Sequence, residues 1–104
     1  MTAPAAPSIK ARDQGGVVVR ITIPAVTGAV SYGLFRDGEP LDNVLAGITY
    51  DATVVADETY EYRATSINAE EEESALSDPA RVHVLDPAAA DTTPTPALDI
   101  YRRL

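Results

Sequence analysis

The stretch TYEYRATSIN, from Thr59 to Asn68, decides the fold of this chain. Its aromatic and then small residues recur at every second position, with charged or polar residues between them. This period of two is typical of a β-strand that buries one of its faces. We therefore predict a long, half-buried strand. The inward set is Tyr60, Tyr62, Ala64 and Ser66, and the set facing water is Glu61, Arg63 and Thr65.

Short strand patterns separated by turn residues extend on both sides of this stretch. The clearest is VVVRITI (17–23), which Pro24 ends because proline cannot donate to a strand ladder. Asp37-Gly38 predicts a tight turn, since both residues tolerate positive φ. The other patterns are SIKAR (8–12), VSYGLFR (30–36), GITYDATVV (47–55) and ALSDPARVHVL (75–85).

Together these patterns predict about seven short strands without a helical period, which is typical of an all-β, Ig-like antiparallel sandwich. On VVVRITI we expect Val17, Val19, Ile21 and Ile23 to share the inward face. On the last strand we expect Val82 and Val84 to point inward and Arg81 and His83 outward.

The composition divides the chain into three parts. Residues 1–7 are rich in Ala, Pro and Thr and predict a flexible leader. Residues 8–85 carry the strand patterns and predict the sandwich. Residues 86–104 begin as a Pro/Ala/Thr linker, which cannot hold a core, and end in the apolar and basic run LDIYRRL (98–104).

Three stretches resemble a fibronectin type III domain of the bacterial and bacteriophage kind. They are ITIPAVTGAVSYGLFRDGEP (21–40), YDATVVADETYEYRATSIN (50–68) and EESALSDPARVHV (72–84). The resemblance implies a two-sheet sandwich in which Tyr60 is the tyrosine corner, with its ring in the core and its hydroxyl bonded to the backbone a few residues upstream.

The sequence departs from the pattern of that family at three places. Ile23 stands where the family usually has a core tryptophan. Ala56-Asp57 stands where Pro-Gly is common, and glutamates stand in the last hairpin where a glycine is usual. The first departure suggests a smaller core, or an aromatic side chain nearby that compensates for the lost ring.

Charge and composition exclude several classes of function. The 104-residue chain has a net charge of −8 and no cysteine. Disulfides and thiolate metal sites are therefore excluded. Nucleic acid and anionic membranes are disfavoured as partners, because their recognition needs a basic surface. The first ten residues lack the charged and apolar regions of a secretory signal, and no run is long enough to span a membrane.

The candidate chemical groups are few. His83 is the single histidine and is expected to point outward, so we expect no catalytic triad, metal site or cofactor, and no enzyme activity. The acidic run Glu70–Glu73 is expected to be a solvated loop, with a calcium site or a dock for a basic partner as the alternative. Phe35 and Ile67 point away from the inward sets and could form an exposed apolar patch.

The last seven residues are the strongest functional clue in the sequence. Apolar side chains that follow a Pro-rich linker need burial somewhere, so we expect a docking arm that binds a neighbouring protein by strand addition or as a short helix. The alternative is that the arm folds back on its own domain or frays. The expected partner-binding residues are Leu98, Ile100, Tyr101, Arg102, Arg103 and Leu104.

Three classes of non-enzymatic function remain open. The resemblance implies an accessory or decoration protein of a bacteriophage virion (capsid, neck or tail), made in the host cytoplasm and bound to another virion protein or to copies of itself. The alternative is a carbohydrate-binding or spacer module of a bacterial extracellular enzyme, although the chain has no tryptophan to bind sugar. An adhesion or engineered binding domain is disfavoured, because the loops lack the Tyr and Ser richness of selected binding sites.

Overall fold

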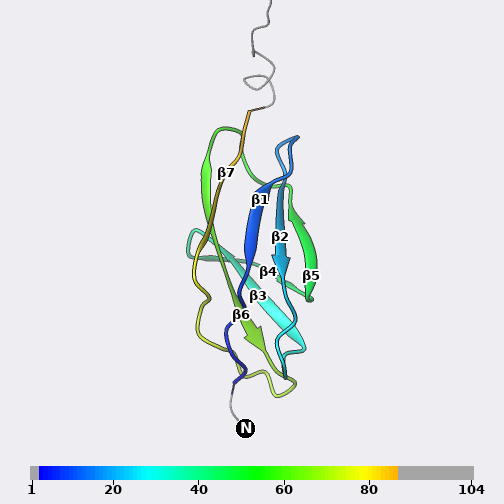
Figure 1. Ribbon diagram of the computed structural model, residues 1–104. Helices are drawn as coiled ribbons and strands as arrows, with labels where there is room; N and C mark the ends of the chain where they lie inside the picture. Colours follow the sequence, from blue (N-terminus) through cyan, green and yellow to red (C-terminus); the bar gives the residue numbers. More distant parts are fainter. Residues whose placement is uncertain (1–2, 87–104) are drawn as a thin grey trace, which may run out of the picture.

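The computed structural model describes residues 3–86, and this part of the chain contains β-strands and no helix (Figure 1). The strands are β1 (Lys10–Asp13), β2 (Val19–Ile23), β3 (Ser31–Arg36), β4 (Glu39–Val44), β5 (Gly47–Asp51), β6 (Thr59–Ile67) and β7 (Ala80–His83). The predicted strand number and the all-β class are confirmed. The predicted division into leader, sandwich and arm stays a prediction, because residues 87–104 lie outside the described part.

The strands form two antiparallel sheets that pack face to face. Sheet A has the order β1-β2-β5 and sheet B the order β4-β3-β6-β7. The long strand β6 lies inside sheet B and pairs with β3 on one side and β7 on the other. The predicted two-sheet sandwich is therefore confirmed.

The core lies between the sheets and is built from the alternating positions of β2 and β6. Val19, Ile21 and Ile23 are fully buried, and they face Tyr62 and Ala64, which are also fully buried. Removing this aliphatic and aromatic surface from water stabilises the fold by roughly 25 cal/mol per Å² of apolar area. The buried hydrophobic set is Val19, Ile21, Ile23, Tyr32, Leu34, Val54, Tyr62, Ala64, Val82 and Val84.

The hairpin between β3 and β4 follows the turn chemistry of its two loop residues. Asp37 has φ of 52° and Gly38 has φ of 85°, and Arg36 pairs with Glu39 across them. Positive φ at both central residues matches the right-handed twist of the strands. Pro40 lies on β4, an edge strand of sheet B, where a residue without an N–H is tolerated.

Strand β2 begins at Val19, two residues later than the pattern at 17–23 predicts. Gly15, Gly16 and Val17 all have positive φ, and Gln14 donates its N–H to the carbonyl of Val18. The connection from β1 therefore occupies Val17, although this side chain still packs against the core. The alternation in the sequence continues through Val17, so it gave no signal of the turn.

The prediction that Thr65 faces water is wrong. Its side chain is on the outer face of sheet B, but the residue is only 3% exposed. The residue opposite is Gly33, which has no side chain, and the Thr65 hydroxyl fills this space and donates to the carboxylate of Glu73. A Cβ atom at Gly33 would lie 2.8 Å from Thr65 Oγ1, so the glycine allows the threonine to be covered.

Two serines continue the edge of β6 where no regular strand is formed. Ser74 donates its N–H to the carbonyl of Ser66, and its hydroxyl accepts the N–H of Ser66 at 2.9 Å. Ser77 makes the same two bonds to Ala64. Each serine hydroxyl thus replaces the backbone carbonyl of a strand, which satisfies the buried backbone of β6 before β7 begins at Ala80.

Candidate functional site

A buried carboxylate, Asp51, joins the two sheets at the end of β5. It is 5% exposed, and Oδ2 accepts hydrogen bonds from Tyr62 Oη at 2.7 Å and from Arg36 Nη1 at 2.8 Å. Arg36 lies on β3 and Tyr62 on β6, so both donors come from sheet B, whereas Asp51 belongs to sheet A. The other oxygen, Oδ1, accepts from the N–H of Thr53 at 3.0 Å and from its hydroxyl at 2.6 Å.

The protonation of this cluster follows from burial and from these hydrogen bonds. Burial opposes ionisation of Asp51, but hydrogen bonds from Thr53, Tyr62 and Arg36 outweigh it and hold the pKa of the carboxyl below its usual value. Hydrogen bonding to Asp51 raises the pKa of Arg36. Burial, then the bond to Asp51, raises the pKa of Tyr62. The cluster therefore consists of an ionised Asp51 paired with a charged Arg36, together with a neutral Tyr62. The hydrogen-bond donors of Arg36 and Tyr62 point at the Asp51 carboxylate.

Tyr60 lies at the start of β6 beside this cluster. Its hydroxyl accepts the N–H of Val55, five residues upstream, at 2.7 Å. Its ring is half-buried, packs against the core and lies 5.2 Å from the guanidinium carbon of Arg36. The ring thus supports Arg36 from a second side, within the range of a cation–π contact.

His83 is exposed on β7, as the alternation of the last strand predicts. Its Nδ1 atom lies 2.9 Å from the hydroxyl of Thr59, and its Nε2 atom lies 3.1 Å from a carboxylate oxygen of Asp57. A hydroxyl, an imidazole and a carboxylate are the groups of a nucleophilic triad. The Asp57 side chain is, however, 80% exposed, whereas the acid of a working triad is buried and orients the imidazole. The contact therefore links the end of β7 to the start of β6 and to the turn that precedes β6, on the surface of the domain.

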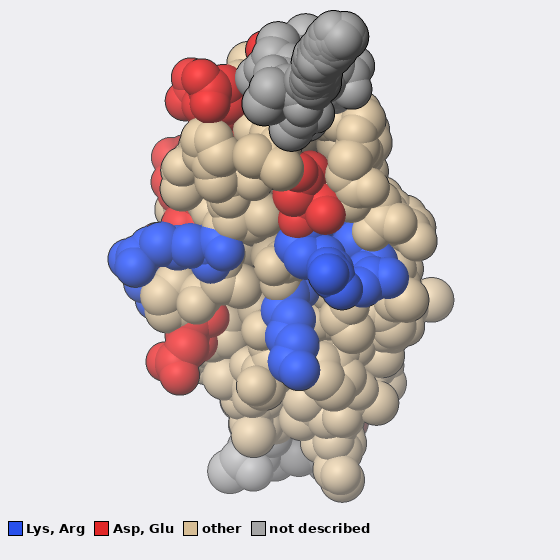
Figure 2. Space-filling model, turned by 45° about the horizontal axis from the view of Figure 1, so that its top comes forward, with Lys and Arg blue, Asp and Glu red and all other residues tan. Residues whose placement is uncertain are grey.

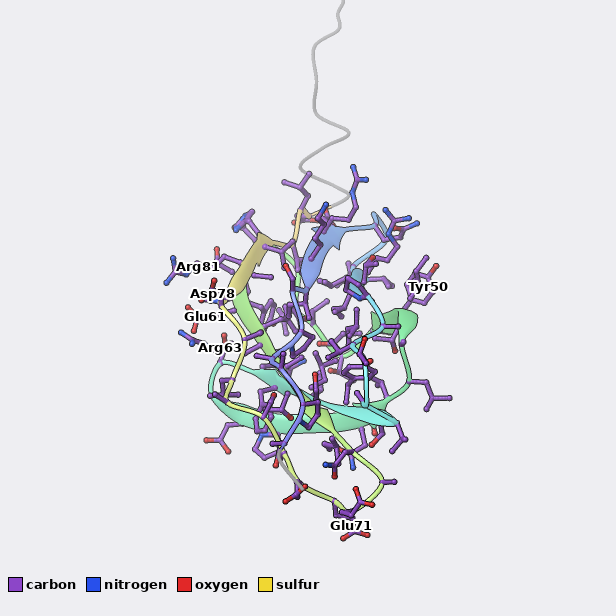
Figure 3. All side chains as sticks on the ribbon, turned by 60° about the horizontal axis from the view of Figure 1, so that its bottom comes forward. Tyr50, Glu61, Arg63, Glu71, Asp78 and Arg81 are labelled. Atoms are coloured by element: carbon purple, nitrogen blue, oxygen red, sulfur yellow. The ribbon has the colours of Figure 1, made fainter. Side chains whose placement is uncertain are left out.

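The acidic run Glu70–Glu73 is organised by Asn68, which is 5% exposed. The Asn68 Oδ1 atom accepts the N–H groups of Glu70 at 3.0 Å and Glu72 at 2.8 Å, and its Nδ2 atom donates to the Glu72 carboxylate at 2.8 Å. Glu73 accepts from Thr65. Two of the four carboxylates are thus used inside the domain, and they do not converge on a point as calcium ligands do. The tip of this loop is marked by Glu71 in Figure 3.

The predicted patch of Phe35 and Ile67 is not strongly exposed, because both residues are half-buried on the outer face of sheet B. The Phe35 ring covers Gly33. The large apolar side chains that are more than half exposed lie elsewhere. They are Val30, Leu45, Ile48, Tyr50, Val55 and Leu85.

On the outer face of β6 and β7, charged side chains form ion pairs with one another. Glu61 pairs with Arg81 at 2.9 Å and with Arg63 at 3.5 Å. Figure 3 shows these three residues gathered on one side of the domain, with Tyr50 projecting from the opposite side. Exposed pairs of this kind contribute at most about 1 kcal/mol each, and here two arginines share one carboxylate.

Three further expectations concern the docking arm, a metal site and a membrane span. The docking-arm residues 98–104 lie outside the described residues. Within residues 3–86, no three His, Asp or Glu side chains form a group that could hold a metal ion. The same part of the chain has no helix that is long and apolar enough to cross a membrane.

Sequence reasoning missed the Asp51 cluster. The local pattern pointed the other way, because the apolar residues Ile48 and Tyr50 alternate with Thr49 and Asp51, and alternation favours the apolar residues as the inward set. In the structure Asp51 is the buried residue, and Ile48 and Tyr50 are exposed. The partner could not be read from the sequence, since Arg36 is fifteen residues away and lies on the other sheet.

Comparisons with solved structures place this arrangement of sheets among fibronectin type III-like folds. A Fn3-like protein from Clostridium thermocellum matches 82% of this chain and 97% of its own, with 22% identity and a TM-score of 0.71. The CbhA fibronectin(III)-like modules of the same organism match 82% of this chain and 96% of theirs, with 16% identity and a TM-score of 0.55.

A third match is to the Clostridium perfringens spore cortex lytic enzyme SleM. It covers 78% of this chain but only 28% of SleM, with 11% identity and a TM-score of 0.65. No family model matches the sequence, and no curated protein is similar to it. The chain has a fibronectin type III-like fold. The bacterial modules among the matches give no support to the bacteriophage origin suggested by the sequence.

Proposed function

We propose that this domain is a non-catalytic spacer module of a bacterial protein. This proposal rests on the positions of the two termini of the described chain. They leave the sandwich at its opposite poles, with residue 3 near one pole and residue 86 at the other (Figure 1). A domain inserted between neighbours in this way holds them apart by its own length. Strand β6 alone has nine residues, which is about 30 Å at the usual rise per residue.

The interior of the domain suits this role. The fully buried core and the Asp51 cluster fix one sheet on the other, so the distance between the ends is held by packed side chains. The structural similarity to bacterial fibronectin type III-like modules, and to part of a lytic enzyme chain, supports a place beside enzyme domains.

A carbohydrate-binding role is the less favoured form of the same proposal. Sugar binding normally uses exposed aromatic rings. Tyr32 is buried and Tyr60 is half-buried, whereas Tyr50 is 57% exposed and is the tyrosine of the described part that offers its ring to a ligand. One ring is a small platform for a polysaccharide.

Distance measurement tests the spacer proposal. The chain has no cysteine, so Ala5→Cys and Leu85→Cys place two spin labels at exposed positions near the two ends. Double electron–electron resonance is expected to give one narrow distance distribution, unchanged by xylan, cellulose oligomers or chitin oligomers. A broad distribution would contradict a rigid spacer. Retardation in a polysaccharide gel that is lost on Tyr50→Ala would favour the carbohydrate-binding form.

The virion decoration role is a separate proposal that rests on the arm at residues 98–104. If the arm docks on another virion protein or on a second copy, deleting Leu98–Leu104 should abolish assembly and leave the melting curve nearly unchanged. Sizing and pull-down experiments with the full and shortened chains measure this. Assembly that survives the deletion would rule the arm out as the attachment.

A further inference from the structure

The outer face of sheet A carries two rows of side chains that the strand register brings together. Inward positions on these strands are Ala11, Val19 and Ile21, so the residues between them point outward. We name the outward set the basic-apolar face. Across the three strands its first row is Lys10, Thr22 and Ile48, and its second row is Arg12, Arg20 and Tyr50.

The cations of this face have no carboxylate partner among the described residues. Arg36, Arg63 and Arg81 each form an ion pair with an acidic side chain, whereas Lys10, Arg12 and Arg20 form none. Figure 2 shows Lys and Arg side chains gathered near the middle of one face of the molecule. Acidic side chains border this group in Figure 2, but no described carboxylate forms an ion pair with Lys10, Arg12 or Arg20, which is unexpected in a chain with a net charge of −8.

The register makes this cluster costly in the free protein. Arg12 lies directly opposite Arg20 in the antiparallel ladder, and like charges in that position repel. The Arg20 Nε atom is also buried without a hydrogen-bond partner among the described residues. The Asp13 carboxylate, at the end of β1, accepts the backbone N–H groups of Gly15 and Leu85 and forms no ion pair with Arg12 or Arg20. A carboxylate bound between the two guanidinium groups would offset the repulsion between Arg12 and Arg20.

Apolar surface adjoins the cations in both rows. Ile48 is 56% exposed and Tyr50 is 57% exposed, at the β5 side of the same face. Beside this apolar surface lies a hollow lined by Lys10, Ala11, Arg12, Arg20 and Thr22. Tyrosine and arginine are enriched in protein–protein contacts.

We propose that the basic-apolar face binds an acidic protein segment whose carboxylates pair with Arg12 and Arg20 and whose apolar side chains cover Ile48 and Tyr50. Charge complementarity requires an anionic partner. The isoleucine favours a polypeptide over an acidic polysaccharide or a nucleic acid, because those polymers would leave Ile48 uncovered or cover it with polar groups. This contact is independent of the spacer role.

Fluorescence anisotropy of labelled probes tests the proposal with the full chain. The probes are a decapeptide of alternating Glu and Leu, the same peptide with Gln in place of Glu, polygalacturonate and a single-stranded DNA decamer. We expect the acidic peptide to bind more tightly than the other three, with an affinity that falls as salt rises.

Variants then locate the contact. The double variant Arg12→Gln/Arg20→Gln should lower the affinity for the acidic peptide by about tenfold or more, the size of one lost carboxylate contact. The single variant Ile48→Ser should also weaken binding of this peptide. Arg81→Gln, on the opposite sheet, is the matched control and should leave binding unchanged. Unchanged melting curves verify that the surface variants are folded. Failure of the acidic peptide to bind, equal binding of polygalacturonate or DNA, or an equal loss in the Arg81 variant would overturn the proposal.

Discussion

Replacing Asp51 with alanine is expected to destabilise the domain by about 3 kcal/mol. Removing one member of a buried ion pair typically costs about 3–5 kcal/mol, because the remaining charge stays buried without a partner. Here the Arg36 side chain is 25% exposed, so water partly compensates and the lower end of that range applies. The Tyr62 hydroxyl also loses its acceptor in a fully buried position. Since small domains are stable by only about 5–15 kcal/mol, this is a large fraction of the total.

Urea denaturation of the wild type and the variant measures this loss. The double variant Arg36→Met/Asp51→Ala is the informative control, because removing both charges leaves neither ion unpaired. The double variant should be more stable than Asp51→Ala alone. A loss below about 1 kcal/mol in the single variant would mean that the cluster does not join the sheets energetically.

The dependence of folding stability on pH is a second test of the Asp51 cluster. The pKa of Asp51 is lowered in the folded protein, so its carboxylate stabilises the fold above the pKa of an unfolded aspartate, about 3.9, and this contribution is lost as the pH falls through the lower folded pKa. The difference in stability between wild type and Asp51→Asn should therefore be constant near neutral pH and shrink below about pH 4. A difference that grows on acidification would contradict the assigned charge state.

The sequence predicted those features of the fold that depend on local alternation and turn chemistry. The inward positions of β2 and β7, and the Asp37-Gly38 turn, follow from periods of two and from residues that tolerate positive φ. The errors arose where a contact joins distant segments. Thr65 is covered because Gly33 lies opposite it and Glu73 folds back over it, and no pattern within a single strand encodes that arrangement.

The same distinction applies to the sites. Lys10, Arg12 and Arg20 look like scattered charges in the sequence, and their gathering into a cluster depends on the register between β1 and β2. The two residues of an antiparallel pair can be far apart in sequence, so register has to be known before a surface can be read. The same register places the exposed Tyr50 ring beside these cations.

Replacing Tyr62 with alanine is expected to be more damaging than replacing Tyr60, although the sequence alone marks Tyr60 as the structural tyrosine. Tyr62 is fully buried between the sheets, and removing a buried aromatic ring costs about 3–5 kcal/mol through lost burial and the cavity left behind. It also donates to the Asp51 carboxylate, a bond to a charged group worth about 1.5–3 kcal/mol. Tyr60 is half-buried and accepts one backbone N–H, so Tyr60→Ala should cost about 2–4 kcal/mol.

Chemical denaturation of four variants separates the ring from the hydroxyl at each position. Tyr62→Phe should lose the bond to Asp51 and keep most of the packing, and Tyr60→Phe should lose only the bond from the Val55 N–H, about 1 kcal/mol. The alanine variants add the loss of each ring. If Tyr60→Ala costs less than about 1 kcal/mol, its ring and hydroxyl do not fix the corner. If it costs more than Tyr62→Ala, burial between the sheets is not what determines the stability of this domain.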